Sequence, residues 1–158
     1  MFKPIFLALG VFVLVAFAPF NLRAQASRKS VPAAEVNGTF RMNFTGKFRG
    51  NSNEIKILAL GGGRLRVAMD LTYPYVVNGE MMANVGQLDG EATIKGDTAV
   101  YSSTEFGQCT ITMKFVKPGM IKVSQEGSDA SCGFGNNVRS TGTYRKISGT
   151  KPTFGQHD

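Results

Sequence analysis

Histidine is almost absent from this chain of 158 residues, and the one copy, His157, is the penultimate residue. A serine or cysteine nucleophile needs a nearby general base, most often histidine, and zinc sites draw on histidine or on closely spaced cysteines. The two cysteines do not form a C-x-x-C motif. The sequence therefore predicts no catalytic residues, no metal ligands and no cofactor, and an enzyme is the least favoured class of function.

Runs of basic residues and helical patterns are missing as well. The chain carries 18 Lys and Arg against 11 Asp and Glu, a formal net charge of +7, but the basic residues are scattered among the acids. Nucleic-acid binding is not expected, because it needs a concentrated basic patch or helix. A solvated cationic surface is favoured, and a basic patch facing an anionic envelope component is the alternative. No segment beyond the N-terminal region shows a sustained 3.6-residue apolar period, so we expect at most a short helical turn.

One long apolar run is present, and it lies at the N-terminus. Lys3 precedes a nearly continuous apolar stretch over residues 5–17, and the small residues Ala24 and Ala26 match the pattern that signal peptidase reads. A run of roughly 14 apolar residues is shorter than the roughly 20 that a membrane-spanning helix needs. A cleaved signal peptide, residues 1–26, is therefore favoured over a retained anchor.

The exported part suits one domain with a single modest core. We expect residues 27–36 to form a flexible N-terminal segment, residues 37–148 a single β-barrel domain and residues 149–158 a flexible tail. The formal net charge falls to +5, because Lys3 and Arg23 leave with the signal and no acid does. The mature protein is expected in the periplasm or the medium, without a stable membrane anchor.

The two cysteines, Cys109 and Cys132, both fall in the exported part. In an oxidising compartment an even pair is interpreted first as a disulfide. The bridge would close a loop of about two dozen residues, which is worth roughly 3 kcal/mol in the chain-entropy model. We therefore predict a disulfide between Cys109 and Cys132.

Apolar and polar residues alternate with a period of two over residues 40–44, 65–71 and 111–115, the pattern of half-buried antiparallel strands. Short turns would connect such strands into hairpins with apolar residues on one face. Turns at 61–63, 96–97 and 117–119 would pair Ala59 with Leu65, Ile57 with Val67, Ile55 with Met69, Ile94 with Ala99, Ala92 with Tyr101, Phe115 with Ile121 and Met113 with Val123.

With strands near 38–46 and 141–147, about eight short strands follow one another mostly as neighbours in sequence order. A meander of this kind can close on itself and so remove its edges. The predicted fold is all-β: an eight-stranded antiparallel up-and-down barrel of calycin-like type with one disulfide. An open β-sandwich is the alternative.

The stretch TYPYVVNGEMMANVG at 72–86 interrupts the alternation and is predicted to be the longest loop between strands. Aromatic and methionine side chains on a loop at a barrel mouth suit a protein partner or a small apolar ligand. The alternative is that they plug the barrel end, because small barrels fill their interiors with side chains. The candidate partner-binding residues are Tyr73, Tyr75, Met81 and Met82.

The stretch CGFGNNVRSTGTYRK at 132–146 combines one cysteine of the predicted bridge with several glycines and basic residues. It is predicted to be a closure segment that the disulfide holds at the barrel end, where Gly133 and Gly135 allow the backbone a close approach. A ligand loop is the alternative. In that case Arg139 would bind a carboxylate or a phosphate.

Four successive stretches carry a resemblance to known proteins: GEATIKGDTAVY at 90–101, CTITMKF at 109–115, IKVSQEG at 121–127 and CGFGNNVRSTGTYRK at 132–146. They resemble a group of small exported bacterial domains, mostly uncharacterised, that share C-G-F-G-x-N-V followed by G-x-Y-x-K. The resemblance covers about the last seventy residues and implies the disulfide and the barrel, but no particular activity.

In size, export and β-rich build the chain is also broadly similar to the periplasmic lysozyme inhibitors. Their inhibitory signature of Ser-Gly followed shortly by Tyr is absent, because SGTKP at 148–152 has no tyrosine after it. A cationic chain would also be repelled over long range by the cationic common lysozymes. The similarity therefore implies the build of these proteins and not their target.

These observations favour a non-enzymatic exported binding module. It would act through its end loops on an envelope or extracellular protein, as an inhibitor or an adaptor. The alternative is a lipocalin-like carrier of a small apolar ligand, which would need an internal cavity.

Overall fold

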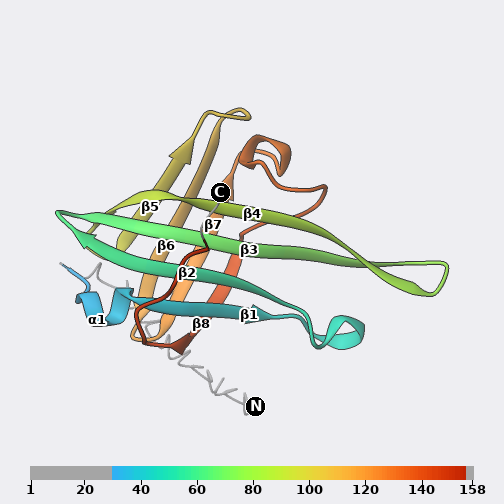
Figure 1. Ribbon diagram of the computed structural model, residues 1–158, viewed down its shortest axis with the longest axis horizontal. Helices are drawn as coiled ribbons and strands as arrows, with labels where there is room; N and C mark the ends of the chain where they lie inside the picture. Colours follow the sequence, from blue (N-terminus) through green and yellow to red (C-terminus); the bar gives the residue numbers. More distant parts are fainter. Residues whose placement is uncertain (1–29, 156–158) are drawn as a thin grey trace, which may run out of the picture.

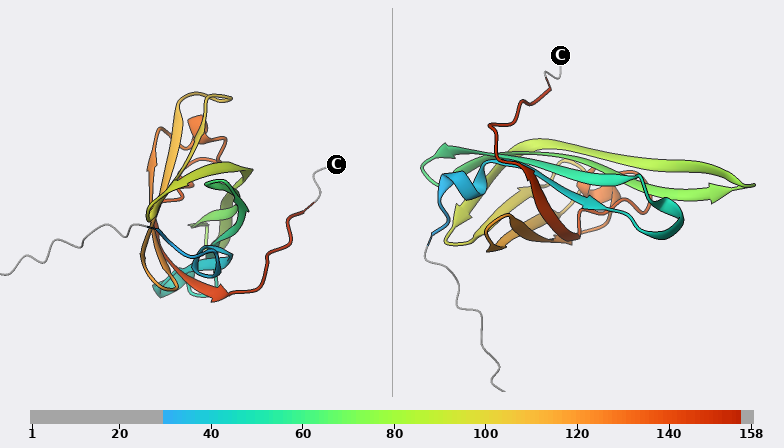
Figure 2. Two further views of the ribbon diagram at one scale, coloured as in Figure 1. Left: turned by 90° about the vertical axis from the view of Figure 1, so that its left-hand side faces the viewer. Right: turned by 90° about the horizontal axis from the view of Figure 1, so that it is seen from below.

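The structure, a computed structural model, describes residues 30–155, and its eight strands form a closed antiparallel barrel (Figure 1; Figure 2). Each strand pairs with its neighbours in sequence, and β1 pairs with β8 to close the ring. The predicted meander is confirmed, and the open sandwich is excluded. The signal peptide expected at 1–26 and His157 lie outside the described residues. The strands are β1 (Gly38–Asn43), β2 (Ser52–Gly61), β3 (Arg64–Val77), β4 (Glu80–Lys95), β5 (Thr98–Ser103), β6 (Cys109–Lys117), β7 (Met120–Glu126) and β8 (Gly142–Ser148).

The hairpin registers follow the predicted turns. Strand β2 ends at Gly61 and β3 begins at Arg64, so the turn itself is a pair of glycines, and β6 and β7 are joined by Pro118 and Gly119. Six predicted cross-strand pairs are present: Ala59 with Leu65, Ile57 with Val67, Ile55 with Met69, Ile94 with Ala99, Phe115 with Ile121 and Met113 with Val123. The ladder between β4 and β5 ends at Thr93 and Val100, one pair short of the predicted pair Ala92 and Tyr101.

The barrel interior is filled with side chains. Alternate residues of the strands point inward, and most of those that form the core expose less than 2 % of their surface; the largest are Tyr144, Phe40, Ile55, Ile57, Leu65, Met69, Leu71, Ile111, Met113 and Ile121. The rings of Phe40 and Phe115 meet edge to face, 6.3 Å between centroids. The buried hydroxyl of Tyr144 donates to the Ser140 carbonyl at 2.8 Å, and burial raises the pKa of Tyr144. A closed ring of strands thus encloses one continuous core.

Helical structure in the described residues is limited to short pieces: α1 (Ala33–Val36), η1 (Gly46–Phe48) and η2 (Ala130–Cys132). Helix α1 lies in the segment 27–36 expected to be flexible, yet Val36 is buried in the core, so the fold begins before the barrel strands. In the expected tail, the Phe154 ring lies 4.3 Å from the Arg66 guanidinium. The described residues contain no helix with the length and apolarity to cross a membrane.

The predicted disulfide is present. Cys109 and Cys132 are bonded, with 5.0 Å between their Cα atoms and a sequence separation of 23. The bridge joins the first residue of β6 to the end of η2, in the connection between β7 and β8. A disulfide is compatible with export to an oxidising compartment.

The predicted loop at 72–86 is wrong. Strand β3 continues through Tyr73, Pro74 and Tyr75 to Val77, and β4 starts at Glu80, so a two-residue turn is all that separates them. The hairpin extends beyond the other strands, toward the right of Figure 1 and of the right-hand view in Figure 2.

Candidate functional site

The projecting end of the β3–β4 hairpin, residues 72–85, is the clearest candidate site, and we call it the arm. Strand β2 accompanies β3 as far as the pair Glu54 and Asp70, whereas β3 and β4 stay paired to Val77 and Glu80. Beyond the barrel the arm is therefore a ribbon of two strands. It has two faces that no further strand covers (Figure 1).

The sequence dictates this ribbon locally. Every second residue of β3 is apolar throughout its length: Leu65, Val67, Met69, Leu71, Tyr73, Tyr75 and Val77. The turn is Asn78-Gly79, with φ of 50° and 86°, and Asn-Gly is the strongest short hairpin signal because both central residues of such a turn need positive φ. The apolar stripe that lines the core inside the barrel continues along β3 outside it. There its side chains have no opposing strand to bury them.

Two of the predicted site residues stack on one face of the arm. The rings of Tyr73 and Tyr75 lie 6.4 Å apart between centroids, with 26° between their planes. Met82 is the cross-strand partner of Tyr75, so its side chain is on the same face. The structure thus brings together Tyr73, Tyr75 and Met82. We call this the tyrosine face.

Met81 is on the opposite face, where its cross-strand partner is Val76. The amide nitrogen Nδ2 of Asn51 lies 3.6 Å from its Sδ, which places the β1–β2 connection against this side of the arm. The two methionines, adjacent in sequence, therefore serve different surfaces. We call the side of Met81 and Val76 the valine face.

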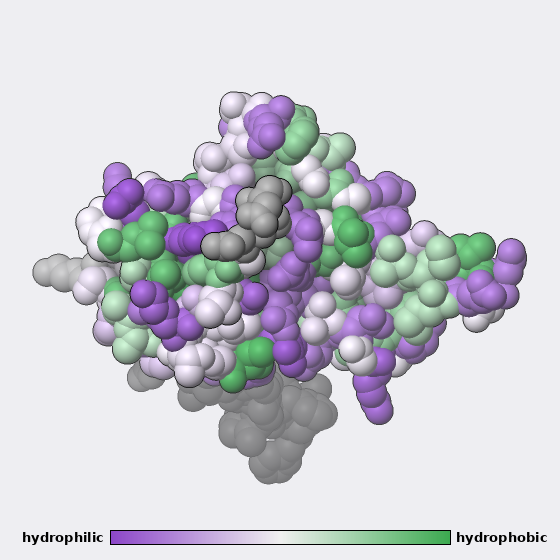
Figure 3. All heavy atoms as spheres, in the orientation of Figure 1, coloured by the Kyte–Doolittle hydropathy of each residue, from purple (hydrophilic) through white to green (hydrophobic). Residues whose placement is uncertain are grey.

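Apolar exposure is concentrated on the arm. Figure 3 shows hydrophobic colours along much of the part that projects to the right, ahead of a hydrophilic tip. Large apolar side chains of the described residues that stand exposed include six from this short ribbon: Tyr73 (41 %), Val76, Val77, Met81 (54 %), Met82 and Val85 (63 %). Contiguous exposed apolar surface on a small protein marks an interaction site more often than scattered single residues do. Because they are exposed, these side chains do not plug the barrel.

A second segment holds the base of the arm. Residues 132–140, the clamp segment, run alongside β4, where the amide of Gly135 donates to the Val85 carbonyl at 3.0 Å and Asn84 Nδ2 donates to the Asn136 carbonyl at 2.7 Å. A Cβ at Gly135 would lie 2.7 Å from the Val85 oxygen, so the close approach requires glycine. The predicted closure segment therefore does more than close the barrel end, since it positions the arm.

The clamp segment is held in turn by Asp129. Its carboxylate accepts hydrogen bonds from the amide of Asn137 at 2.5 Å and from the amide of Ala130 at 3.0 Å. These two bonds, led by that from Asn137, hold the pKa of Asp129 below its ordinary value of 3.8. Asn137 has a positive φ of 62°, so the carboxylate stabilises a turn that is costly for a residue with a side chain.

Arg139, the other predicted binding residue, is exposed but faces a different neighbour. Its Nη1 donates to the Gly127 carbonyl at 3.3 Å, beside the end of β7. The structure thus brings Tyr73, Tyr75, Met81 and Met82 together in one arm. Arg139 instead contacts Gly127, at the start of the β7–β8 connection.

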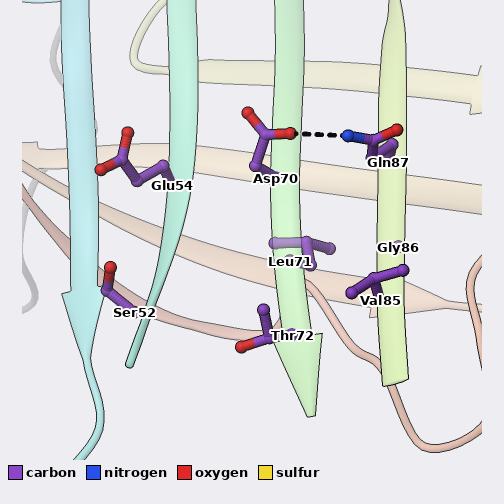
Figure 4. Close-up of a pocket in the computed structure, with 8 residues that line it drawn as sticks. All are labelled: Ser52, Glu54, Asp70, Leu71, Thr72, Val85, Gly86 and Gln87. Carbon is purple, nitrogen blue, oxygen red and sulfur yellow. Dashed lines mark hydrogen bonds between the residues drawn. The ribbon is translucent and has the colours of Figure 1, made fainter. Parts of the chain in front are cut away.

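A shallow groove of about 310 Å³ lies at the base of the arm, on the outside of the sheet (Figure 4). Its two carboxylates are already engaged: Glu54 accepts from Arg41 Nε at 2.8 Å, and Asp70 accepts from Gln87 Nε2 at 3.2 Å. The hydroxyl of Thr72 is buried without a hydrogen-bond partner among the described residues. No group of three or more His, Cys, Asp or Glu within residues 30–155 is placed to hold a metal ion.

Charged side chains are arranged differently on the two halves of the barrel. Ion pairs on β1–β4 join Arg41 to Glu54, Arg64 to Glu91 and Arg66 to Asp89. On the other half, Lys114 of β6 is directly opposite Lys122 of β7, both exposed, and like charges in that position are unfavourable. Residues 72–85 themselves contain one charge, Glu80. The arm is therefore the nearly uncharged, apolar part of a cationic protein.

Comparison with protein-family models, with curated proteins and with solved structures found no match to this chain.

Sequence reasoning missed Val76, Val77 and Val85 as members of the exposed surface. Two signals pointed to them: the Asn78-Gly79 dipeptide and the unbroken apolar alternation of β3. Pro74 obscured both, because proline argues against a central strand. Here it lies in the part of β3 that has no paired strand except β4, where proline is tolerated.

Proposed function

We propose that the chain is a non-enzymatic exported binding module, periplasmic or secreted, that uses the arm to engage an envelope or extracellular protein as an inhibitor or adaptor. The observation that carries this proposal is the exposure of six large apolar side chains on a ribbon that projects from a filled barrel. Tyrosines give a large contact area at low entropic cost, and methionines adapt to irregular partners.

The alternative of a carrier has less support. A carrier needs an internal cavity for an apolar ligand, whereas the buried side chains of the strands meet across the interior. An enzyme is disfavoured because the carboxylates of the groove are held by neighbours and residues 30–155 contain no histidine. Export is supported by the N-terminal apolar run and by the disulfide.

The experiment begins with the exported protein itself. Its intact mass should correspond to a chain starting at Ser27, which tests the localisation. A photo-crosslinking residue at Met82 should then trap a partner in envelope extract, identified by mass spectrometry. The partner is purified, and its binding to the exported chain is titrated. A stoichiometric complex is the expected result.

Two variants assign the contact to the arm. Tyr73→Ser combined with Tyr75→Ser should weaken binding of the purified partner while keeping the melting temperature within a few degrees, because Tyr73 is exposed, Tyr75 is half-buried and neither belongs to the core. The matched control is Ile147→Ser, which removes an equally exposed apolar side chain on β8 (49 %). If the control weakens binding as much as the tyrosine variant, or if the tyrosine variant binds normally, the arm is not the binding surface.

A further inference from the structure

The outward edge of β4 is unpaired at Met81 and Ala83, and its orientation can be derived from two hydrogen bonds. The Val85 carbonyl points away from β3, since it accepts from Gly135. Opposite it, the Thr72 amide points away from β4, because it donates to Asn53 Oδ1 at 2.8 Å. The pair of Thr72 and Val85 therefore makes no hydrogen bond within the hairpin.

Hydrogen-bonded and non-bonded pairs alternate along an antiparallel ladder. The pairs two and four residues toward the tip, Pro74 with Ala83 and Val76 with Met81, must therefore also direct their backbone groups outward. Pro74 agrees with this assignment, because proline has no N–H to give to the ladder.

The two edges of the arm differ in what they offer. On β3, the Thr72 amide is already bonded to Asn53 and Pro74 has no amide hydrogen, so Val76 keeps the one outward donor between residues 72 and 76. On β4, both Met81 and Ala83 present an amide and a carbonyl, and no described residue hydrogen-bonds to these groups. Proline is a common device to block an edge strand. The arm thus has one blocked edge and one open edge.

We propose that the open β4 edge pairs with the same edge of a second copy of this chain, forming a four-stranded antiparallel sheet from two arms. This inference goes beyond the proposed function and does not depend on it, because it uses backbone groups and leaves the tyrosine face of the arm available to a partner.

The edge is complementary to itself. Met81 and Ala83 each present one donor and one acceptor, so two such edges can pair antiparallel with donors facing acceptors. The segment 81–83 carries no charge, so no like charges meet within the pairing although each chain is cationic overall. The clamp segment, bonded to Val85, sets the limit of the pairing toward the barrel.

The assembly closes at two copies. In the four-stranded sheet the outermost strands are the two β3 strands, and each carries on its outer edge Pro74, which is buried and has no amide hydrogen. Further strand addition is therefore blocked on both sides, and a two-fold pairing leaves no repeat that could extend into a fibre.

Sedimentation velocity of the exported chain over a concentration series tests the pairing. A reversible dimer is expected. Ala83→Pro should weaken association at least about tenfold, because it removes two symmetry-related hydrogen bonds. It should not disturb the hairpin, since the outward amide takes no part in it. Val76→Pro is the matched control on the other edge and should leave association unchanged.

Hydrogen exchange on the unmodified chain gives a second reading that needs no variant. The amides of Met81 and Ala83 should exchange more slowly as concentration rises, while that of Val76 should not. If either proline variant loses its fold, Ala83→Lys and Val76→Lys replace the pair, because an edge lysine also opposes strand addition. A monomer at all concentrations overturns the proposal. A dimer that both edge variants weaken alike, or that neither weakens, also overturns it. The same holds if another protein, and not a second copy, occupies the open edge.

Discussion

The amide of Gly135 and the carbonyl of Val85 are joined by a hydrogen bond of 3.0 Å, which connects the clamp segment to the base of the arm. The clamp segment also contains Cys132, and the disulfide ties that residue to the start of β6. A single chain of contacts therefore runs from the covalent bridge to the exposed ribbon. The position of the candidate binding surface depends on it.

Gly135→Ala should destabilise the protein by about 1 to 3 kcal/mol, because the new methyl group would lie 2.7 Å from the Val85 oxygen and force the two segments apart. Urea unfolding of the purified protein measures the change. The control is Gly149→Ala, where a Cβ has nothing within 4 Å. Equal stability of the two variants would show that the contact is dispensable.

Removing the disulfide with Cys109→Ala and Cys132→Ala together should lower the free energy of unfolding by roughly 2 to 5 kcal/mol, since the unfolded chain gains the freedom of the opened loop. Thermal unfolding with and without reductant measures the effect. Reductant should lower the stability of the parent protein and leave that of the double variant unchanged. A parent protein that is insensitive to complete reduction would contradict this expectation.

The clamp segment should loosen in acid. The pKa of Asp129 is lower in the folded state than its ordinary value of 3.8, so its contribution to stability is present above that value and is lost as the pH falls through the folded pKa. Hydrogen exchange of the Asn137 amide, which bonds this carboxylate, should speed up below about pH 4 relative to other turns.

Asp129→Asn removes the titration while keeping the size of the side chain. The difference in melting temperature between the parent and this variant should be largest at neutral pH and should shrink as the pH falls below about 4. A difference that stays constant over this range would mean that another group controls the clamp segment.

Lys146→Met should release helix α1 from the barrel. The Lys146 ammonium group donates to the carbonyls of Ala34 and Asn37 at 2.9 and 2.8 Å, and burial lowers its pKa. Methionine keeps the apolar stem but leaves the two carbonyls without this donor, at a cost of about 1 to 2 kcal/mol. Faster hydrogen exchange around Val36 is the expected signature. Lys117→Met, at an exposed position of β6, should change neither the stability nor this exchange rate.

Local sequence alone determined most of the barrel. The alternation of Ile55 and Ile57 against Val67 and Met69 predicts one register for β2 and β3, because a slip by one residue would turn the apolar set to solvent. The disulfide also followed from sequence, since the two cysteines of a chain that is expected to be exported have one possible pairing. These features depend on contacts between strands that are neighbours in sequence or on the number of cysteines.

Tertiary structure decided the candidate site. The apolar stripe of β3 reads the same at Met69 and at Tyr75, yet one side chain is buried and the other lies on the arm. The difference arises because β2 stops pairing with β3 at Asp70, and the end of a neighbouring strand is a non-local property. The position of Pro74 on the blocked edge and the hydrogen bond from Arg139 to Gly127 are also non-local properties, because both depend on how segments distant in sequence pack. Sequence periodicity specifies which residues share a face, and only the packed barrel specifies which faces and edges stay uncovered.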